Sequence, residues 1–239
     1  MKTKLLLAIM LVGTACLFSC SKDDNDNLPG IPMISSISIG RNPSPNPLIL
    51  SYNSDNKLVS YSYGNTVEHS YTYGNGTVTR EIFGFVGQVL AIDVYTLNNK
   101  GQAISSVTYA DEIGIGESTR TTYEYDENGY MTRKVVVAYP NDSAITIYTV
   151  LDGNVISETC SGKSYAYSYT YDYYYDKSNT IGDENQGIYF LGKQSVNLVR
   201  KIISDADVRT FTYEFDEKGR VSKQSCVSFS DYNVFYSYL

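Results

Sequence analysis

The stretches TYEYDENGYMTRK (Thr122–Lys134) and TYEFDEKGRVSKQ (Thr212–Gln224) are two copies of one unit, and they decide the fold. Each copy begins with alternating aromatic residues, passes through an acidic turn and ends in a second alternating run. Asp126 and Asp216 can open a type I turn by bonding the backbone, and Gly129 and Gly219 supply the positive φ that follows it. Each unit is therefore predicted to be a β-hairpin.

Looser copies of this unit occupy much of the remaining chain. They are SYNSDNKLVSY (Ser51–Tyr61), YTYGNGTVTREI (Tyr71–Ile82), YTLNNKGQAISSV (Tyr95–Val107) and VLDGNVISETC (Val150–Cys160). Consecutive hairpins make an antiparallel meander, and the chain after residue 32 has no clear 3.6-residue apolar period. We predict a single all-β domain over residues 33–239. Residues 179–197 lack the repeat and are predicted to be a long loop, with one short strand at Ile188–Leu191.

The N-terminal residues indicate export and anchoring. A basic start and an apolar run lead to LFSCSKDDND (Leu17–Asp26), an order typical of secretory signals. Because the run ends on Cys20, it resembles a bacterial lipoprotein signal, with cleavage before Cys16 as the alternative. We predict a signal peptide at residues 1–19, a lipidated acidic tether at residues 20–32 and Cys20 as the lipidated residue. The resemblance implies an outer-membrane protein that is held by lipid alone and faces the cell exterior.

Composition and cysteine content narrow the partners. The chain of 239 residues has a formal net charge of −7, which disfavours nucleic acid because phosphate backbones repel acidic surfaces. Cys160 and Cys226 either form a disulfide or lie apart as buried thiols. We find no zinc spacing, calcium loop or nucleotide motif, so we expect neither metal nor cofactor.

The hairpin units, together with FTYEFDEKGR and VNLVRKI near the end, resemble a family of bacterial surface lipoproteins of unknown function with a porin-like fold. The YEYDENG core is also similar to tyrosine-aspartate repeats, of which only two clean copies occur. The family resemblance implies an open, strongly curved antiparallel sheet or partial barrel, and no catalytic residues. An open sheet has two free edges that accept a strand from a partner protein.

The clearest candidate site is a tyrosine ladder in SYAYSYTYDYYYD (Ser164–Asp176). On an extended strand, alternate side chains share one face, here over roughly 30 Å at about 3.3 Å per residue. That face is either a core face or a platform on which sugar rings stack. The ladder consists of Tyr165, Tyr167, Tyr169, Tyr171, Tyr173 and Tyr175.

Other chemistry is weakly indicated. His69 is the only histidine and is expected to face solvent in a strand. The acidic pairs Asp111-Glu112 and Asp183-Glu184 are predicted to lie in solvated loops, although glycosidases also use two carboxylates.

Charged residues argue against a membrane-spanning barrel. Arg80, Arg133 and Lys223 share sequence parity with Val78, Met131 and Val221, so one strand face would carry charge into lipid.

Three function classes remain from the sequence. We expect a non-enzymatic, surface-anchored lipoprotein that binds a glycan or glycoprotein. The alternatives are a structural or assembly partner of another envelope protein, and a glycan-cleaving enzyme.

Overall fold

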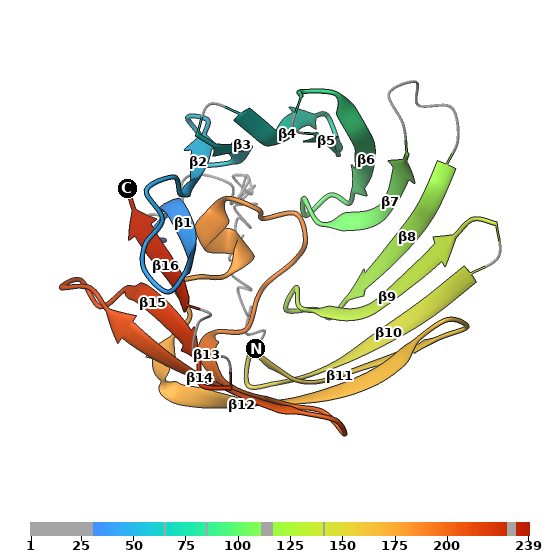
Figure 1. Cartoon of the computed structure of the whole chain (residues 1–239). Helices are drawn as coiled ribbons and strands as arrows, with labels where there is room; N and C mark the ends of the chain where they lie inside the picture. The colour runs from blue at the N-terminus through green and yellow to red at the C-terminus, as the bar shows by residue number, and fades with distance from the viewer. Residues whose placement is uncertain (1–30, 65, 85, 111–116, 141, 229–232) are drawn as a thin grey trace, which may run out of the picture.

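The computed structural model describes residues 31–64, 66–84, 86–110, 117–140, 142–228 and 233–239. Its strands form one closed antiparallel barrel in which each strand pairs with its neighbours in sequence and β1 pairs with β16 (Figure 1). The all-β meander of hairpins is confirmed. Cys20, the predicted signal peptide and residues 20–30 of the predicted tether lie outside the described residues.

The strands follow the predicted hairpins closely. They are β1 (Ile34–Gly40), β2 (Leu48–Tyr52), β3 (Leu58–Tyr63), β4 (Thr66–Gly74), β5 (Thr77–Phe83), β6 (Val89–Leu97), β7 (Ala103–Tyr109), β8 (Glu117–Tyr125), β9 (Met131–Ala138), β10 (Asp142–Leu151), β11 (Asn154–Gly162), β12 (Ala166–Ser178), β13 (Asn197–Ile203), β14 (Val208–Phe215), β15 (Val221–Cys226) and β16 (Asn233–Tyr238). One short 3-10 helix, η1 (Asp183–Gln186), lies between β12 and β13.

The repeated turns have the geometry that their residues require. Gly129 and Gly219 have φ of 91° and 76°. Asp126 Oδ1 accepts a hydrogen bond from the Tyr130 backbone N–H at 2.8 Å, and Asp216 Oδ1 accepts one from Arg220 at 2.9 Å. These side-chain bonds hold the tight turns because they replace backbone partners that the chain reversal leaves unpaired.

The expectation of an open sheet is wrong, because the first and last strands pair and complete the barrel. The β1–β16 ladder runs from Ile34↔Tyr238 to Gly40↔Asn233. Closure satisfies the backbone groups that two free edges would expose. It also removes the edges to which a partner strand was expected to add.

Residues 179–196, here called the closing segment, cross the barrel at the end where the tight hairpin turns lie (Figure 1). Its backbone forms hydrogen bonds with the backbone at successive turns. Two of its carbonyls accept: that of Gly187 from the Leu58 N–H and that of Phe190 from the Ala103 N–H. Two of its N–H groups donate: that of Lys193 to the Gly129 carbonyl and that of Val196 to the Gly153 carbonyl. We call this the closed end. Among the described residues, the connections at the opposite, open end run only between neighbouring strands.

The predicted short strand at Ile188–Leu191 is absent from the structure. Ile188 and Phe190 instead pack into the core, where the Phe190 and Tyr95 rings lie 4.8 Å apart. The segment runs across the strand ends rather than along a strand, so it has no neighbour with which to form a ladder. The core therefore sits at the closed end; its other buried members are Ile34, Leu50, Leu58, Tyr71, Val78 and Ala103.

Five tyrosines stabilise the closed end in the same way. Each donates its hydroxyl to a backbone carbonyl near the start of the preceding strand. The pairs are Tyr52 with Ile34, Tyr73 with Leu58 at 2.8 Å, Tyr173 with Val155 at 2.6 Å, Tyr213 with Val199 at 2.7 Å and Tyr238 with Val221 at 2.8 Å. The aromatic residue that recurs before these turns therefore has a structural role. Its hydroxyl satisfies a backbone carbonyl, and its ring packs at the closed end.

The charged residues were expected to share a strand face with the apolar residues two positions earlier. This expectation is wrong for two of the three. A register shift after the turn separates Met131 from Arg133, and another separates Val221 from Lys223. A bulge moves the following side chains to the other face. Lys223 thus pairs with Glu214 on the outer face, whereas Val221 is fully buried inside. The outer wall carries the ion pairs Arg133–Glu124 and Lys223–Glu214, and Arg80 lies inside.

Candidate functional site

A cavity of about 340 Å³ lies at the inner side of the closing segment, against the wall formed by β9 to β13. We call it the floor cavity. Its wall combines aromatic and aliphatic side chains with one carboxylate and with amide, hydroxyl and ammonium groups from the closing segment. The lining residues that matter here are Tyr148, Glu158, Tyr171, Tyr173, Lys193, Gln194 and Ser195. Apolar walls with a few convergent polar groups are typical of small-molecule sites.

Glu158 is the centre of the polar groups. Its two carboxylate oxygens accept hydrogen bonds from Tyr167 Oη at 2.7 Å and from Tyr171 Oη at 2.8 Å. In the sheet it pairs with Tyr148 on β10 and with Tyr169 on β12, so their side chains share its face. A carboxylate has about four acceptor positions, so two remain for a ligand.

The tyrosine hydroxyls near Glu158 remain protonated donors. Burial raises the pKa of Tyr171 well above its ordinary value, and the bond to the Glu158 carboxylate raises the pKa further. The pKa of Tyr167 is raised by the same two causes in the same order. At neutral pH both phenols are therefore neutral and donate to Glu158.

The structure divides the predicted tyrosine ladder into parts. Tyr167, Tyr169 and Tyr171 are half-buried on the inner wall, with the first two rings 5.0 Å apart. Tyr165, near the open end, is 49% exposed, whereas Tyr173 at the closed end is only 4% exposed. Tyr175, beyond Tyr173 and past the level of the floor cavity, is 68% exposed.

Tyr173 belongs to the structural tyrosines as well as to the ladder. Its hydroxyl reaches the Val155 carbonyl and lies 2.9 Å from Ser195 Oγ in the closing segment. It therefore fixes the floor beneath the more accessible rings. The half-buried part of the ladder is Tyr167, Tyr169 and Tyr171, with the Arg209 guanidinium carbon 5.7 Å from the Tyr169 ring centre.

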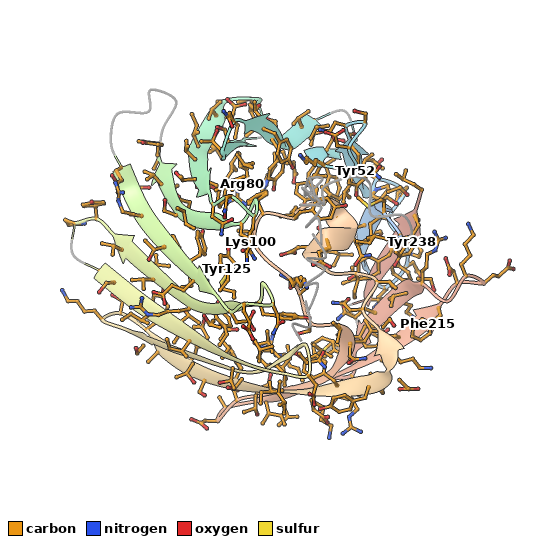
Figure 2. All side chains as sticks on the ribbon, turned by 180° about the vertical axis from the view of Figure 1, so that it is seen from behind. Tyr52, Arg80, Lys100, Tyr125, Phe215 and Tyr238 are labelled. Carbon is orange, nitrogen blue, oxygen red and sulfur yellow. The ribbon has the colours of Figure 1, made fainter. Side chains whose placement is uncertain are left out.

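A buried ion pair lies elsewhere on the inner wall. Arg80 on β5 and Asp93 on β6 are direct cross-strand neighbours, and Arg80 Nε donates to Asp93 Oδ2 at 2.8 Å. Thr108 donates to the other oxygen of Asp93 at 2.5 Å. Figure 2 shows Arg80 and Tyr125 toward the inside of the ring of strands. These groups satisfy one another, and we assign them to the wall rather than to a ligand.

A second cavity of about 400 Å³ lies between the closing segment and the tips of three hairpin turns. Its lining contains three lysines, Lys57, Lys100 and Lys193, and an equal number of acids, Asp55, Glu127 and Glu184. The polar groups of the floor cavity gather around Glu158, whereas those of this second cavity have no common centre. We therefore take the floor cavity as the candidate site.

The other predicted residues lie apart from the floor cavity or outside the described chain. His69 does not simply face solvent: it is half-buried, with its ring 5.6 Å from that of Tyr61. Burial, followed by the charge of Arg80, lowers the pKa of His69. Asp183 and Glu184 form the first turn of η1, where burial raises the pKa of each. Asp111 and Glu112 lie outside the described residues.

Cys160 and Cys226 are separate buried thiols. Within the described ranges, no three His, Cys, Asp or Glu side chains gather as metal ligands. The same part of the chain holds no helix that is long and apolar enough to cross a membrane.

Sequence reasoning missed Glu158 and the role of the closing segment, whose residues were predicted only to form a long loop. Glu158 lies in VISETC without any motif, and only the register of β11 with β12 brings it beside the tyrosines. A strand prediction from β10 to β12 with correct register could have found it. The closing segment carries no repeat, and its length was the one available signal.

The fold and cavity define a barrel that is blocked at one end and lined with tyrosine. Two solved structures have a similar fold: porin-like proteins from Bacteroides uniformis ATCC 8492 and Bacteroides vulgatus ATCC 8482. The first has a TM-score of 0.59 and 16% identity over 86% of this chain and 98% of its own. The second has a TM-score of 0.61 and 12% identity over 87% of this chain and 99% of its own.

These likenesses establish a porin-like fold. No protein-family model matches the sequence, and no curated protein matches it.

Proposed function

We propose that this chain is a surface lipoprotein that binds a glycan inside its barrel without cleaving it. The observation that supports the proposal most directly is the position of Glu158, held between Tyr167 and Tyr171 at the edge of the floor cavity. Sugars combine flat apolar ring faces with hydroxyl donors. The aromatic rings offer surfaces for the former, and the open acceptor positions of Glu158 suit the latter.

The remaining lining groups support binding over hydrolysis. Asn179, Gln194 and Ser195 of the closing segment add hydrogen-bonding groups at the floor. Glycoside hydrolysis uses two carboxylates on either side of the bond that breaks. Among the described residues that line the floor cavity, Glu158 is the one acidic side chain.

The binding test removes polar groups and keeps the shape of the site. Glu158→Gln and Tyr171→Phe each delete part of the charged hydrogen-bond group. A hydrogen bond to a charged group contributes about 1.5–3 kcal/mol, so we expect binding to weaken about tenfold or more. The measurement is a glycan-array screen of residues 33–239, followed by calorimetric titration of each glycan that binds.

Tyr63→Phe on β3 is the matched control, because it removes a phenol hydroxyl from a tyrosine that is 44% exposed and away from the floor cavity. Circular dichroism should show that all three variants keep the fold. Unchanged affinity in Glu158→Gln and Tyr171→Phe would contradict the site, and an array without any bound glycan would contradict the ligand class.

Anchoring is tested separately on the full chain. Cys20→Ala should abolish palmitate labelling and move the protein out of the membrane fraction, because Cys20 is the proposed lipid attachment site. Cys16→Ala should leave both unchanged. The reverse pattern would place cleavage before Cys16. Resistance of the unmodified protein to protease added to intact cells would contradict display on the outer face.

A further inference from the structure

We propose that the barrel receives its glycan end-on: the terminus of a linear chain enters through the open end and its last unit rests in the floor cavity beside Glu158. This inference rests on the proposed function and adds the part of the glycan that is recognised. A site on a flat sheet would bind the middle of a chain, whereas a blind-ended barrel admits a terminus.

The first support is the complete crossing of the closed end. The closing segment forms hydrogen bonds with opposite sides of the barrel. The Gly187 carbonyl accepts from Leu58 at 3.2 Å on β3, and the Val196 N–H donates to Gly153 at 3.0 Å in the turn before β11. On a third side, the Tyr238 hydroxyl of β16 donates to the Thr180 carbonyl at 3.1 Å. A polymer that enters the barrel therefore meets backbone that is bonded to the barrel on three sides.

The second support is the direction of the ladder. The turn that precedes β12 lies at the open end, and the strand runs toward the closed end. Along it, exposure falls from 49% at Tyr165 to 4% at Tyr173. Tyr165 and Tyr167 are nearly parallel, with an interplanar angle of 9° and ring centres 6.5 Å apart. The Tyr167 and Tyr169 rings are tilted by 39° from each other. The rings thus follow the strand from the open end to the floor cavity, over roughly 26 Å from Tyr165 to Tyr173 at about 3.3 Å per residue.

The third support is the placement of the polar groups. Ring surfaces occur along the whole ladder, whereas the closing-segment amides and hydroxyl lie at the floor cavity. Glu158, which pairs with Tyr169 in the sheet, lines the same cavity. Ring stacking tolerates many sugars, whereas directed hydrogen bonds discriminate. The terminal unit therefore determines specificity, and the units behind it add affinity by stacking.

The experiment presents each linear oligosaccharide of an array in three forms: attached through its reducing end, attached through its non-reducing end, and attached through both ends. We expect binding to one of the singly attached forms and at least a tenfold loss for the doubly attached form. Equal binding of singly and doubly attached chains would overturn the end-on mode and leave glycan binding intact. Failure of every form would overturn both proposals.

A variant that fills the floor gives an independent readout. Val199 lines the floor cavity, so Val199→Trp should reduce the affinity for the bound oligosaccharide at least tenfold. Val208→Trp on β14, at an outer position that is 48% exposed, is the control and should bind normally. If Val199→Trp does not fold, titration of the unmodified protein with chains of one to six units decides instead. End-on binding predicts that the single unit is bound and that affinity rises with length to a plateau, and binding only of long chains would overturn it.

Discussion

Replacing Gly187 by valine is expected to detach the closing segment from the hairpin ends and to lower the melting temperature by about 10 °C. Gly187 has a φ of 75°, which strains any residue with a Cβ. A Cβ there would also lie 2.7 Å from the Leu58 nitrogen and 2.8 Å from the Asn56 carbonyl oxygen. Backbone strain and overlap together cost about 2–6 kcal/mol.

A substitution at Gly219 separates the cost of backbone strain from the cost of steric overlap. Its φ of 76° matches that of Gly187, but a Cβ there meets no atom within 4 Å. Gly219→Val should therefore carry the backbone strain alone and lower the melting temperature by only a few degrees. Scanning calorimetry of both variants measures the difference. Equal losses would mean that contact between the closing segment and the turn contributes nothing to stability.

Asp93→Ala is expected to have an equally large effect, because it leaves the Arg80 guanidinium on the inner wall without its carboxylate. The Asp93 side chain is 5% exposed and that of Arg80 is 29% exposed. Breaking one partner of a buried pair typically costs about 3–5 kcal/mol. Chemical denaturation should show this loss in the free energy of unfolding.

The ion pair between Arg133 and Glu124 is the matched control. It also joins neighbouring strands, but its side chains are 36% and 58% exposed. Exposed pairs contribute about 0–1 kcal/mol, so Glu124→Ala should be nearly neutral. A double variant, Arg80→Met with Asp93→Leu, should recover much of the loss because no charge is left unpaired. A mild effect of Asp93→Ala would show that water reaches Arg80.

The hairpins were predictable because their chemistry is local. Asp126 and Gly129 determine a turn within a few residues, and the flanking alternation assigns the strands. Barrel closure depends instead on pairing between Ile34 and Tyr238, which have no complementary pattern in sequence. The bulges were another obstacle, because one extra residue after each turn reverses the face of Arg133 and Lys223.

The candidate site was predictable only in part. The alternation of Tyr167, Tyr169 and Tyr171 correctly indicates a shared face. The same alternation includes Tyr173, which recurs in the repeats for a different reason, namely its bond to the Val155 carbonyl. Glu158 could not be assigned, since its neighbours come from two other strands and depend on register.

Pairing of the first strand with the last also sets the order of events when the chain is made. Ile34 finds Tyr238 only after nearly the whole chain has been synthesised, so no shorter nascent chain can complete the ring. Contacts between residues so distant in sequence form slowly. The hairpins need only neighbouring strands, so we expect closure of the ring to be the last step of folding.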